Sequence, residues 1–144
     1  MNKKNWIEES LYEKIQRLMP IATVGLLVVH KERLLLMLRN NEPAKNEWFV
    51  PGGRILYGET LEDAVKRVLK EKTGLTPLKI RRKGIMSHIW PNSHHIAIFY
   101  RVDVAEDEVK INEEHRAFKW ISKVTDELHP YLKGMIQESE IFLQ

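Results

Sequence analysis

Two glycines and a charged pair downstream of them are the residues whose types and spacing best suit chemistry. Gly52 and Gly53 follow Pro51, and glycines in such a turn allow backbone carbonyl and amide groups to approach a phosphate or a metal ion closely. Arg67 and Glu71 are four residues apart, so on a helix they share a face. A guanidinium suits phosphate oxygens and a carboxylate suits a divalent cation. The spacing therefore indicates a site for a phosphate or a metal ion.

These residues belong to a longer frame, G-x5-E-x7-R-x-U-x-E-x-x-G-U, in which U is a bulky aliphatic residue. The frame resembles the Nudix box, G-x5-E-x7-R-E-U-x-E-E-x-G-U, and so long a frame rarely matches by chance. The matching positions are Gly53, Glu59, Arg67, Leu69, Glu71, Gly74 and Leu75. The resemblance extends through most of the chain. It implies a single Nudix hydrolase domain over residues 1–144, with the box at residues 53–75.

The resemblance implies catalytic importance for Glu59 and Arg67, which hold the loop against the helix in that family. It also implies Mg²⁺, or Mn²⁺, bound by helical glutamates. Val68 and Lys72 stand where the full box has its first and third helical glutamates, so we expect the metal site to be reduced. Two interpretations of Lys72 stay open: it supplies positive charge beside the phosphates, or it extends from the core edge into solvent.

The reduced box resembles that of the GDP-mannose mannosyl hydrolase branch, which breaks the bond at the anomeric carbon of the sugar and releases GDP. Residues 39–44 and 113–120 also resemble this branch. The residues that the resemblance places at the substrate are Arg39, Arg54, Trp48 and Lys72, with Arg67 also at the diphosphate. The metal ligands that it implies are the carbonyl of Gly53 and the carboxylates of Glu71 and Glu114. His115 is implied as the general base, which suits an imidazole of pKa about 6.5.

Two other functions remain open. The first is an ADP-ribose or nucleoside triphosphate pyrophosphatase, which would need more helical carboxylates than this sequence retains. The second is a binding module that senses a nucleotide without cleaving it. The losses at Val68 and Lys72 favour such a module, whereas the retained Arg67 and the Glu114–His115 pair disfavour it.

The overall composition indicates an ordinary globular protein that acts on a small molecule. The 144 residues include no cysteine, 43% are hydrophobic and 30% are charged. The absence of cysteine excludes disulfides and zinc–thiolate sites and fits a cytoplasmic protein. A net charge of +3 suits an anionic nucleotide but is too small to indicate a nucleic-acid surface. The apolar stretch at residues 20–29 is too short to span a membrane.

The elements that must position these residues alternate in type. Helical spacing predicts an amphipathic N-terminal helix over Asn5–Met19, within residues 1–19, that packs on the domain or on a second subunit of a homodimer. A central helix should begin after Thr60 and end at Gly74. The predicted strands are Ile21–His30, Leu34–Arg39, Trp48–Val50, Leu78–Arg82, Ile85–Trp90, His95–Val104 and Ala117–Ile121, and a last helix is predicted over Pro130–Leu143. This order predicts an α/β fold of the Nudix type, an α/β/α sandwich around a mixed sheet.

Overall fold

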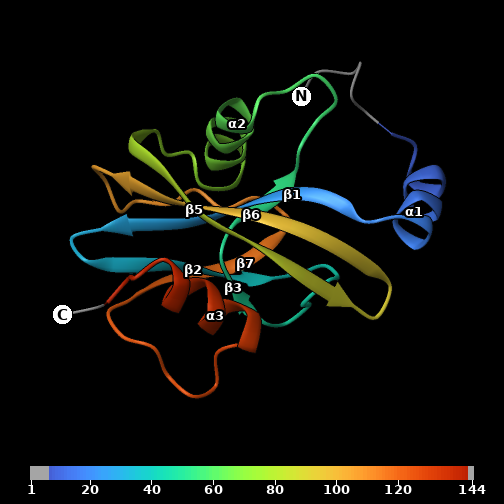
Figure 1. Ribbon diagram of the computed structural model, residues 1–144. Coiled ribbons are helices and arrows are strands. Elements are labelled where there is room, and N and C mark those ends of the chain that lie inside the picture. Colours follow the sequence, from blue (N-terminus) through green and yellow to red (C-terminus); the bar gives the residue numbers. More distant parts are fainter. Residues whose placement is uncertain (1–6, 143–144) are drawn as a thin grey trace.

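A mixed seven-stranded sheet between two helices forms the body of the protein in a computed structural model, which describes residues 7–142 (Figure 1). The elements in chain order are α1 (Glu9–Leu18), β1 (Ile21–His30), β2 (Arg33–Arg39), β3 (Trp48–Phe49), β4 (Gly52–Arg54), α2 (Leu61–Thr73), β5 (Pro77–Trp90), β6 (Ser93–Val104), β7 (His115–Ile121) and α3 (Pro130–Glu138). Only the pairing of β1 with β6 is parallel. The predicted α/β/α sandwich is confirmed.

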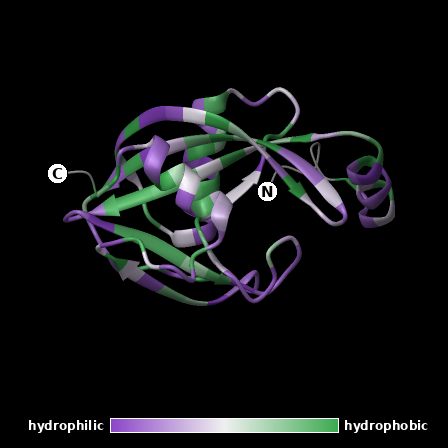
Figure 2. Ribbon diagram, turned by 60° about the horizontal axis from the view of Figure 1, so that its bottom comes forward, coloured by the Kyte–Doolittle hydropathy of each residue, from purple (hydrophilic) through white to green (hydrophobic). Residues whose placement is uncertain are grey.

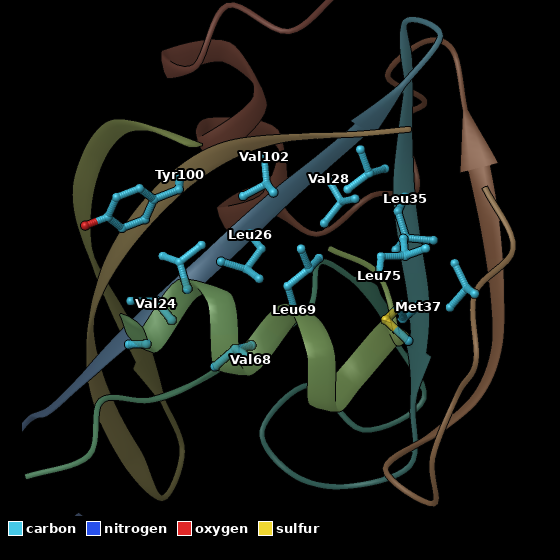
Figure 3. Close-up of a cluster of buried hydrophobic side chains, with 14 residues drawn as sticks. Val24, Leu26, Val28, Leu35, Met37, Val68, Leu69, Leu75, Tyr100 and Val102 are labelled. Atoms are coloured by element: carbon cyan, nitrogen blue, oxygen red, sulfur yellow. The ribbon is translucent and has the colours of Figure 1, made fainter. Parts of the chain in front are cut away.

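Alternation along β1 builds a core on each face of the sheet. Val24, Leu26 and Val28 point to one face, where Val68 and Leu69 of α2 cover them (Figure 3). The intervening Leu27 and Val29 point to the other face and pack with α3. A strand that is buried on both faces reads as a continuous apolar run, which is why the sequence of β1 lacks polar alternation.

The sheet opens between its two central strands. β1 pairs with β2 only beside their connecting turn, where Val29 lies opposite Leu34. Farther along, β1 pairs with β4, and β2 pairs with β3 and β7. The short segment at residues 48–54 therefore crosses from one half of the sheet to the other. Gly52 is required at this crossing, because a Cβ atom there would lie 2.8 Å from the carbonyl oxygen of Val24.

The predicted limits of α2 are confirmed by its caps. The Thr60 hydroxyl accepts a hydrogen bond from the Asp63 backbone amide at 3.1 Å. At the other end, Gly74 adopts a left-handed conformation with φ of 75°, and its amide donates to the Lys70 carbonyl. Both caps are local interactions, which is why the residues near each end predict the limits of this helix.

The prediction of separate strands at Leu78–Arg82 and Ile85–Trp90 was wrong, because β5 runs through both. A register shift between Arg82 and Gly84 takes up one extra residue without ending the strand. Gly84 faces the ring of Phe99, and a Cβ atom at this glycine would lie 2.6 Å from Cζ of that ring. The glycine thus marks a close approach of the backbone to the core and not a turn.

The terminal helices are both shorter than predicted. The N-terminal helix begins at Glu9, and the predicted start at Asn5 lies outside the described residues. α1 lies past the strand ends, where β1 begins (Figure 2), and none of its described residues is buried. Its apolar Leu11 and Leu18 are therefore exposed. α3 ends at Glu138, where the chain turns through Glu140 with φ of 58°. No helix within residues 7–142 is long and apolar enough to span a membrane.

Gly84→Ala should lower the free energy of unfolding by about 1–3 kcal/mol, because the added methyl group must displace the fully buried Phe99 ring. Urea unfolding followed by circular dichroism measures this change. Ser87→Ala, on an exposed position of the same strand, is the matched control and should stay within about 0.5 kcal/mol of wild type. Equal midpoints for all three proteins would contradict the close approach.

Candidate functional site

A cavity of about 350 Å³ occupies the opening between β1 and β2. The crossing segment contributes Gly52, Gly53 and Arg54 to its wall. Lys72 reaches it from α2 and Met135 from α3, so the cavity extends from one helical layer of the sandwich to the other. The volume of the cavity suits a small molecule, and its lining residues come from both helical layers.

The cavity wall carries three basic side chains. Arg39, Arg54 and Lys72 all line it, together with the acidic Glu42 and Glu114. Nε of Arg39 donates to the Pro43 carbonyl at 2.6 Å, which fixes the guanidinium. Burial lowers the pKa of Arg39, while the carboxylates of Glu114 and Glu42 act in the opposite direction. Such a group of cations can bind the oxygens of a diphosphate.

Lys72 forms an ion pair with Glu114 inside the cavity. Only 12% of the Lys72 side chain is exposed, so the interpretation in which it extends into solvent is not supported. Asn112 fixes the loop that carries Glu114: its Oδ1 accepts from the Glu114 amide at 2.9 Å, and its Nδ2 donates to the Glu71 carbonyl at 3.0 Å. The end of α2 and this loop are therefore held together at one wall of the cavity.

Arg67 joins the crossing segment to α2. Its Nε and Nη2 donate to the Glu59 carboxylate at 2.7 and 3.1 Å, and Nη2 also donates to the Arg54 carbonyl at 2.8 Å. Its Nη1 donates to Glu71 at 3.1 Å. The Arg67 hydrogen bond holds the pKa of Glu59 below its usual range, so the pair is ionised at neutral pH.

Glu59 and Arg67 thus position other residues of the site. Neither Glu59 nor Arg67 is among the described residues that line the cavity. The structure confirms the expected contact between the loop and the helix, but it does not bring Arg67 to the place where Arg39, Arg54 and Lys72 meet. Because the Arg67 guanidinium already has three protein partners, little of it is available to a diphosphate.

The side chains of the predicted metal site do not fit a divalent cation. Glu71 pairs with Arg67, and Glu114 pairs with Lys72. Val68 is fully buried, and its Cγ2 would lie 3.1 Å from a Cβ atom at Gly53, so a methyl group faces the backbone there. Across residues 7–142 there is no group of three His, Cys, Asp or Glu side chains that could hold a metal ion.

His115, the predicted base, lies beside the cavity but is enclosed. Its ring is 3% exposed, and neither nitrogen has a hydrogen-bond partner in the described structure. Burial, together with the positive charges of Arg39 and Lys72, lowers its pKa to about 4, although Glu114 acts to raise it. The imidazole is therefore neutral at pH 7 and able to accept a proton.

Toward α3 the cavity continues as a recess whose lining residues carry no carboxylate, lysine or arginine among those the structure describes: Phe49, His88, Trp90, His95, Ala97 and Met135. Burial, followed by the charge of Arg39, lowers the pKa of His95. Nε2 of His88 and Nε1 of Trp90 are buried in this recess without a partner among residues 7–142. Buried polar atoms of this kind normally have a hydrogen-bond partner, which a ligand can supply. Burial, followed by the nearby His95 and His129, lowers the pKa of His88 to about 4, so this recess carries no charge from it at pH 7.

The structure does not bring Trp48 into the cavity. Trp48 packs against the α3-side core to which Phe49 belongs, and the amino group of Lys119 lies 4.3 Å from its ring centre, whereas Phe49 lines the cavity. His95 lines the cavity and His94 does not, as their alternation predicts. Sequence reasoning missed His88, although its position two residues before Trp90 on one strand signals a shared face.

Tyr12 of α1 is a further residue that sequence reasoning missed. It lines the cavity, and the Arg54 guanidinium carbon lies 5.5 Å from the centre of its ring. Burial raises the pKa of its hydroxyl, with the charge of Arg54 acting in the opposite direction. The helical spacing predicted α1, but a lone tyrosine on an amphipathic helix gives no signal that it reaches a binding site.

The chain matches a family model described as NUDIX domain over residues 19–139. It is 33% identical over 135 residues to the low-salt glycan biosynthesis protein Agl8 of Haloferax volcanii, covering 88% of this chain and 86% of that protein. It is 35% identical over 97 residues to an ADP-ribose pyrophosphatase of Methanocaldococcus jannaschii, covering 66% and 57%. A crystal structure of a MutT protein from Methanosarcina mazei matches with a TM-score of 0.75 and 26% identity, over 84% of this chain and 94% of that one.

The buried His88 should make the protein less stable as the pH falls. The unfolded chain takes up a proton on this residue near pH 6.5, whereas the folded protein does so only near pH 4, so stability is lost as the pH falls between these values. His88→Phe keeps an aromatic ring against Tyr131, which stacks on His88 at 4.4 Å. It should reduce the fall in Tm between pH 7 and pH 5 by about 4 °C or more. Parallel falls in wild type and variant would contradict the burial of a neutral imidazole.

Proposed function

The chain belongs to the Nudix family of hydrolases, and from that premise we propose that it cleaves a nucleotide sugar such as GDP-mannose into GDP and free sugar. The observation that carries the proposal is the convergence of Arg39, Arg54 and Lys72 on one cavity that continues into an uncharged recess. A nucleoside diphosphate linked to a sugar has the same division, with two charged phosphates beside a neutral ring.

The charged side of the cavity suits two phosphates. Three cations face two carboxylates there, which leaves a positive surplus for an anionic ligand. Gly52 and Gly53 have no side chains to obstruct an approach to the wall, and the two guanidinium groups offer paired donors to phosphate oxygens. Within residues 7–142 the recess adds no lysine or arginine beyond these, so a third phosphate would lack a partner there. This disfavours nucleoside triphosphates.

The uncharged recess suits a sugar ring. A hydroxyl group both donates and accepts hydrogen bonds, so sugar hydroxyls can serve the neutral imidazole of His88 and the indole N–H of Trp90. The Phe49 and Trp90 rings, with centroids 5.9 Å apart, provide the apolar surface on which the carbon face of a sugar can pack.

The names of two relatives support a substrate in which a nucleoside diphosphate is linked to a sugar. Agl8 is named for glycan biosynthesis, which favours a nucleotide sugar. The Methanocaldococcus relative is named an ADP-ribose pyrophosphatase, and ADP-ribose is also a nucleoside diphosphate linked to a sugar. The two reactions differ in the bond that breaks. ADP-ribose hydrolysis at phosphorus is therefore the second candidate for this chain.

In the proposed reaction, a water oxygen bonds to the anomeric carbon while the bond from that carbon to the diphosphate oxygen breaks. GDP leaves with the electron pair, and Arg39, Arg54 and Lys72 stabilise its charge. His115 accepts the proton of the water. Its unpaired ring nitrogens support this role, whereas its pKa of about 4 makes it a weaker base than a free imidazole. Because the ring is enclosed, the side chain must turn toward the cavity during the reaction, and exposure to solvent there would raise its pKa.

Hydrolysis in ¹⁸O-labelled water tests the proposal, with GDP-mannose, ADP-ribose and GTP as parallel substrates and Mg²⁺ present. We expect label in free mannose, which establishes attack at carbon. Label in a nucleoside monophosphate would instead assign the chain to the pyrophosphatases. If all three nucleotides stay intact while calorimetry detects their binding, the chain is a nucleotide-binding module and the proposed reaction is wrong.

His115→Gln should lower turnover by about two or more orders of magnitude, because glutamine cannot accept the proton of the attacking water. Affinity for GDP should change little, since Arg39, Arg54 and Lys72 remain in place. Steady-state kinetics and calorimetric titration with GDP separate the two effects. His30→Gln controls for the loss of a histidine outside the cavity. Unchanged turnover in His115→Gln would assign the base to another residue.

A further inference from the structure

The α2 face beside the cavity offers an aliphatic group and an ammonium group where the family's box has carboxylates. Nudix hydrolases generally use a divalent cation such as Mg²⁺. Here the methyl groups of Val68 lie under Gly53 and supply no oxygen. One helical turn later, Lys72 points its amino group into the cavity. Of the two departures from the box, Lys72 therefore lies on the cavity wall and Val68 lies behind that wall, under Gly53.

The carboxylates at and around the cavity lie close to protein cations, and for Glu42, which lines the cavity, that cation is Arg39. Arg67 holds both Glu59 and Glu71 away from the cavity wall, and neither acid lines the cavity within the described chain. Glu114 does line it, but Lys72 is its partner. A divalent ion at this wall would have to displace an ammonium group and then lie near Arg39 and Arg54, whose charges oppose it.

We propose that Lys72 takes the place of the divalent cation, so that this protein binds and hydrolyses its substrate without a metal ion. This inference rests on the proposed function. The Lys72 ammonium binds the diphosphate oxygens and, with Arg39 and Arg54, stabilises the negative charge that GDP gains as the carbon–oxygen bond breaks. Glu114 positions Lys72 before the substrate arrives. Lys72 forms no covalent bond, and the water proton still passes to the base.

The position of Lys72 supports a role in binding the substrate and not merely in stabilising the fold. The side chain is only 12% exposed, although a lysine at the end of a surface helix can usually reach solvent. It shares the cavity with two arginines, and the two carboxylates there, Glu42 and Glu114, offset only part of this positive charge. An anionic ligand would offset the remainder, and a diphosphate supplies the charge.

The test compares wild type with Lys72→Met, Lys72→Glu and Lys70→Glu. Lys70 is exposed on the same helix, so Lys70→Glu makes the same charge change away from the cavity and should behave as wild type. Each protein is titrated with Mn²⁺ alone, followed by electron paramagnetic resonance, and with GDP in EDTA, followed by calorimetry. GDP-mannose hydrolysis is measured in EDTA and in Mg²⁺.

For wild type we expect no Mn²⁺ binding below millimolar concentration, GDP binding in EDTA and hydrolysis that EDTA changes less than about twofold. Lys72→Met should weaken GDP binding about tenfold or more, a loss that Mg²⁺ does not restore. Lys72→Glu should gain Mn²⁺ binding through the new carboxylate and Glu114, and any hydrolysis that it retains should then require Mg²⁺.

Micromolar Mn²⁺ binding by wild type, or hydrolysis that EDTA abolishes and Mg²⁺ restores, would overturn the inference. So would equal GDP affinity in wild type and Lys72→Met. The Mn²⁺ and GDP titrations need no turnover, so they decide the role of Lys72 even if GDP-mannose is not a substrate. In that case the proposed function is wrong, and the two titrations still decide whether Lys72 binds a diphosphate without a metal ion.

Discussion

The ion pair between Arg67 and Glu59 is the interaction on which the geometry of the site depends. It is mostly buried, and Arg67 also binds the carbonyl of Arg54 at the end of β4. Loss of either partner would leave the other charge buried without compensation, which is costly. Because Arg54 ends the segment that crosses the sheet and Lys72 lies on the same helix as Arg67, this one guanidinium fixes the distance between two walls of the cavity.

The charge distribution of α2 follows from that arrangement. Arg67 and Glu71 face the loop and neutralise each other with Glu59, so the outer face of the helix needs no ligand to be stable. Val68 faces the core and fits against a glycine. Lys72 alone places an ionised group in the cavity from this helix, and the loop held by Asn112 supplies its counter-charge. Val68 and Lys72, the two departures from the Nudix box, therefore both fit a helix of which no described residue supplies a carboxylate to the cavity.

The sequence predicts those parts of the structure that depend on near neighbours. The caps at Thr60 and Gly74 and the alternation of β1 are local, and they agree with the structure. The continuity of β5 through Gly84 depends on the ring of Phe99, fifteen residues away and on another strand. The recess around His88 depends on strands that meet only in the folded sheet. No local pattern contains that information, so it could not be read from the residues in order.

The division of the cavity separates the part that binds charge from the part that selects the ligand. Arg39 belongs to β2, Arg54 to the crossing segment, and Arg67 and Lys72 to α2, whereas His88 and Trp90 belong to β5 and face α3. Substitutions of His88 or Trp90 therefore leave the Arg67–Glu59 ion pair intact, since neither side chain contacts Arg67 in the described structure. Under the proposed function, a change in the recess would therefore alter the group accepted beside the diphosphate without altering the residues that hold the diphosphate.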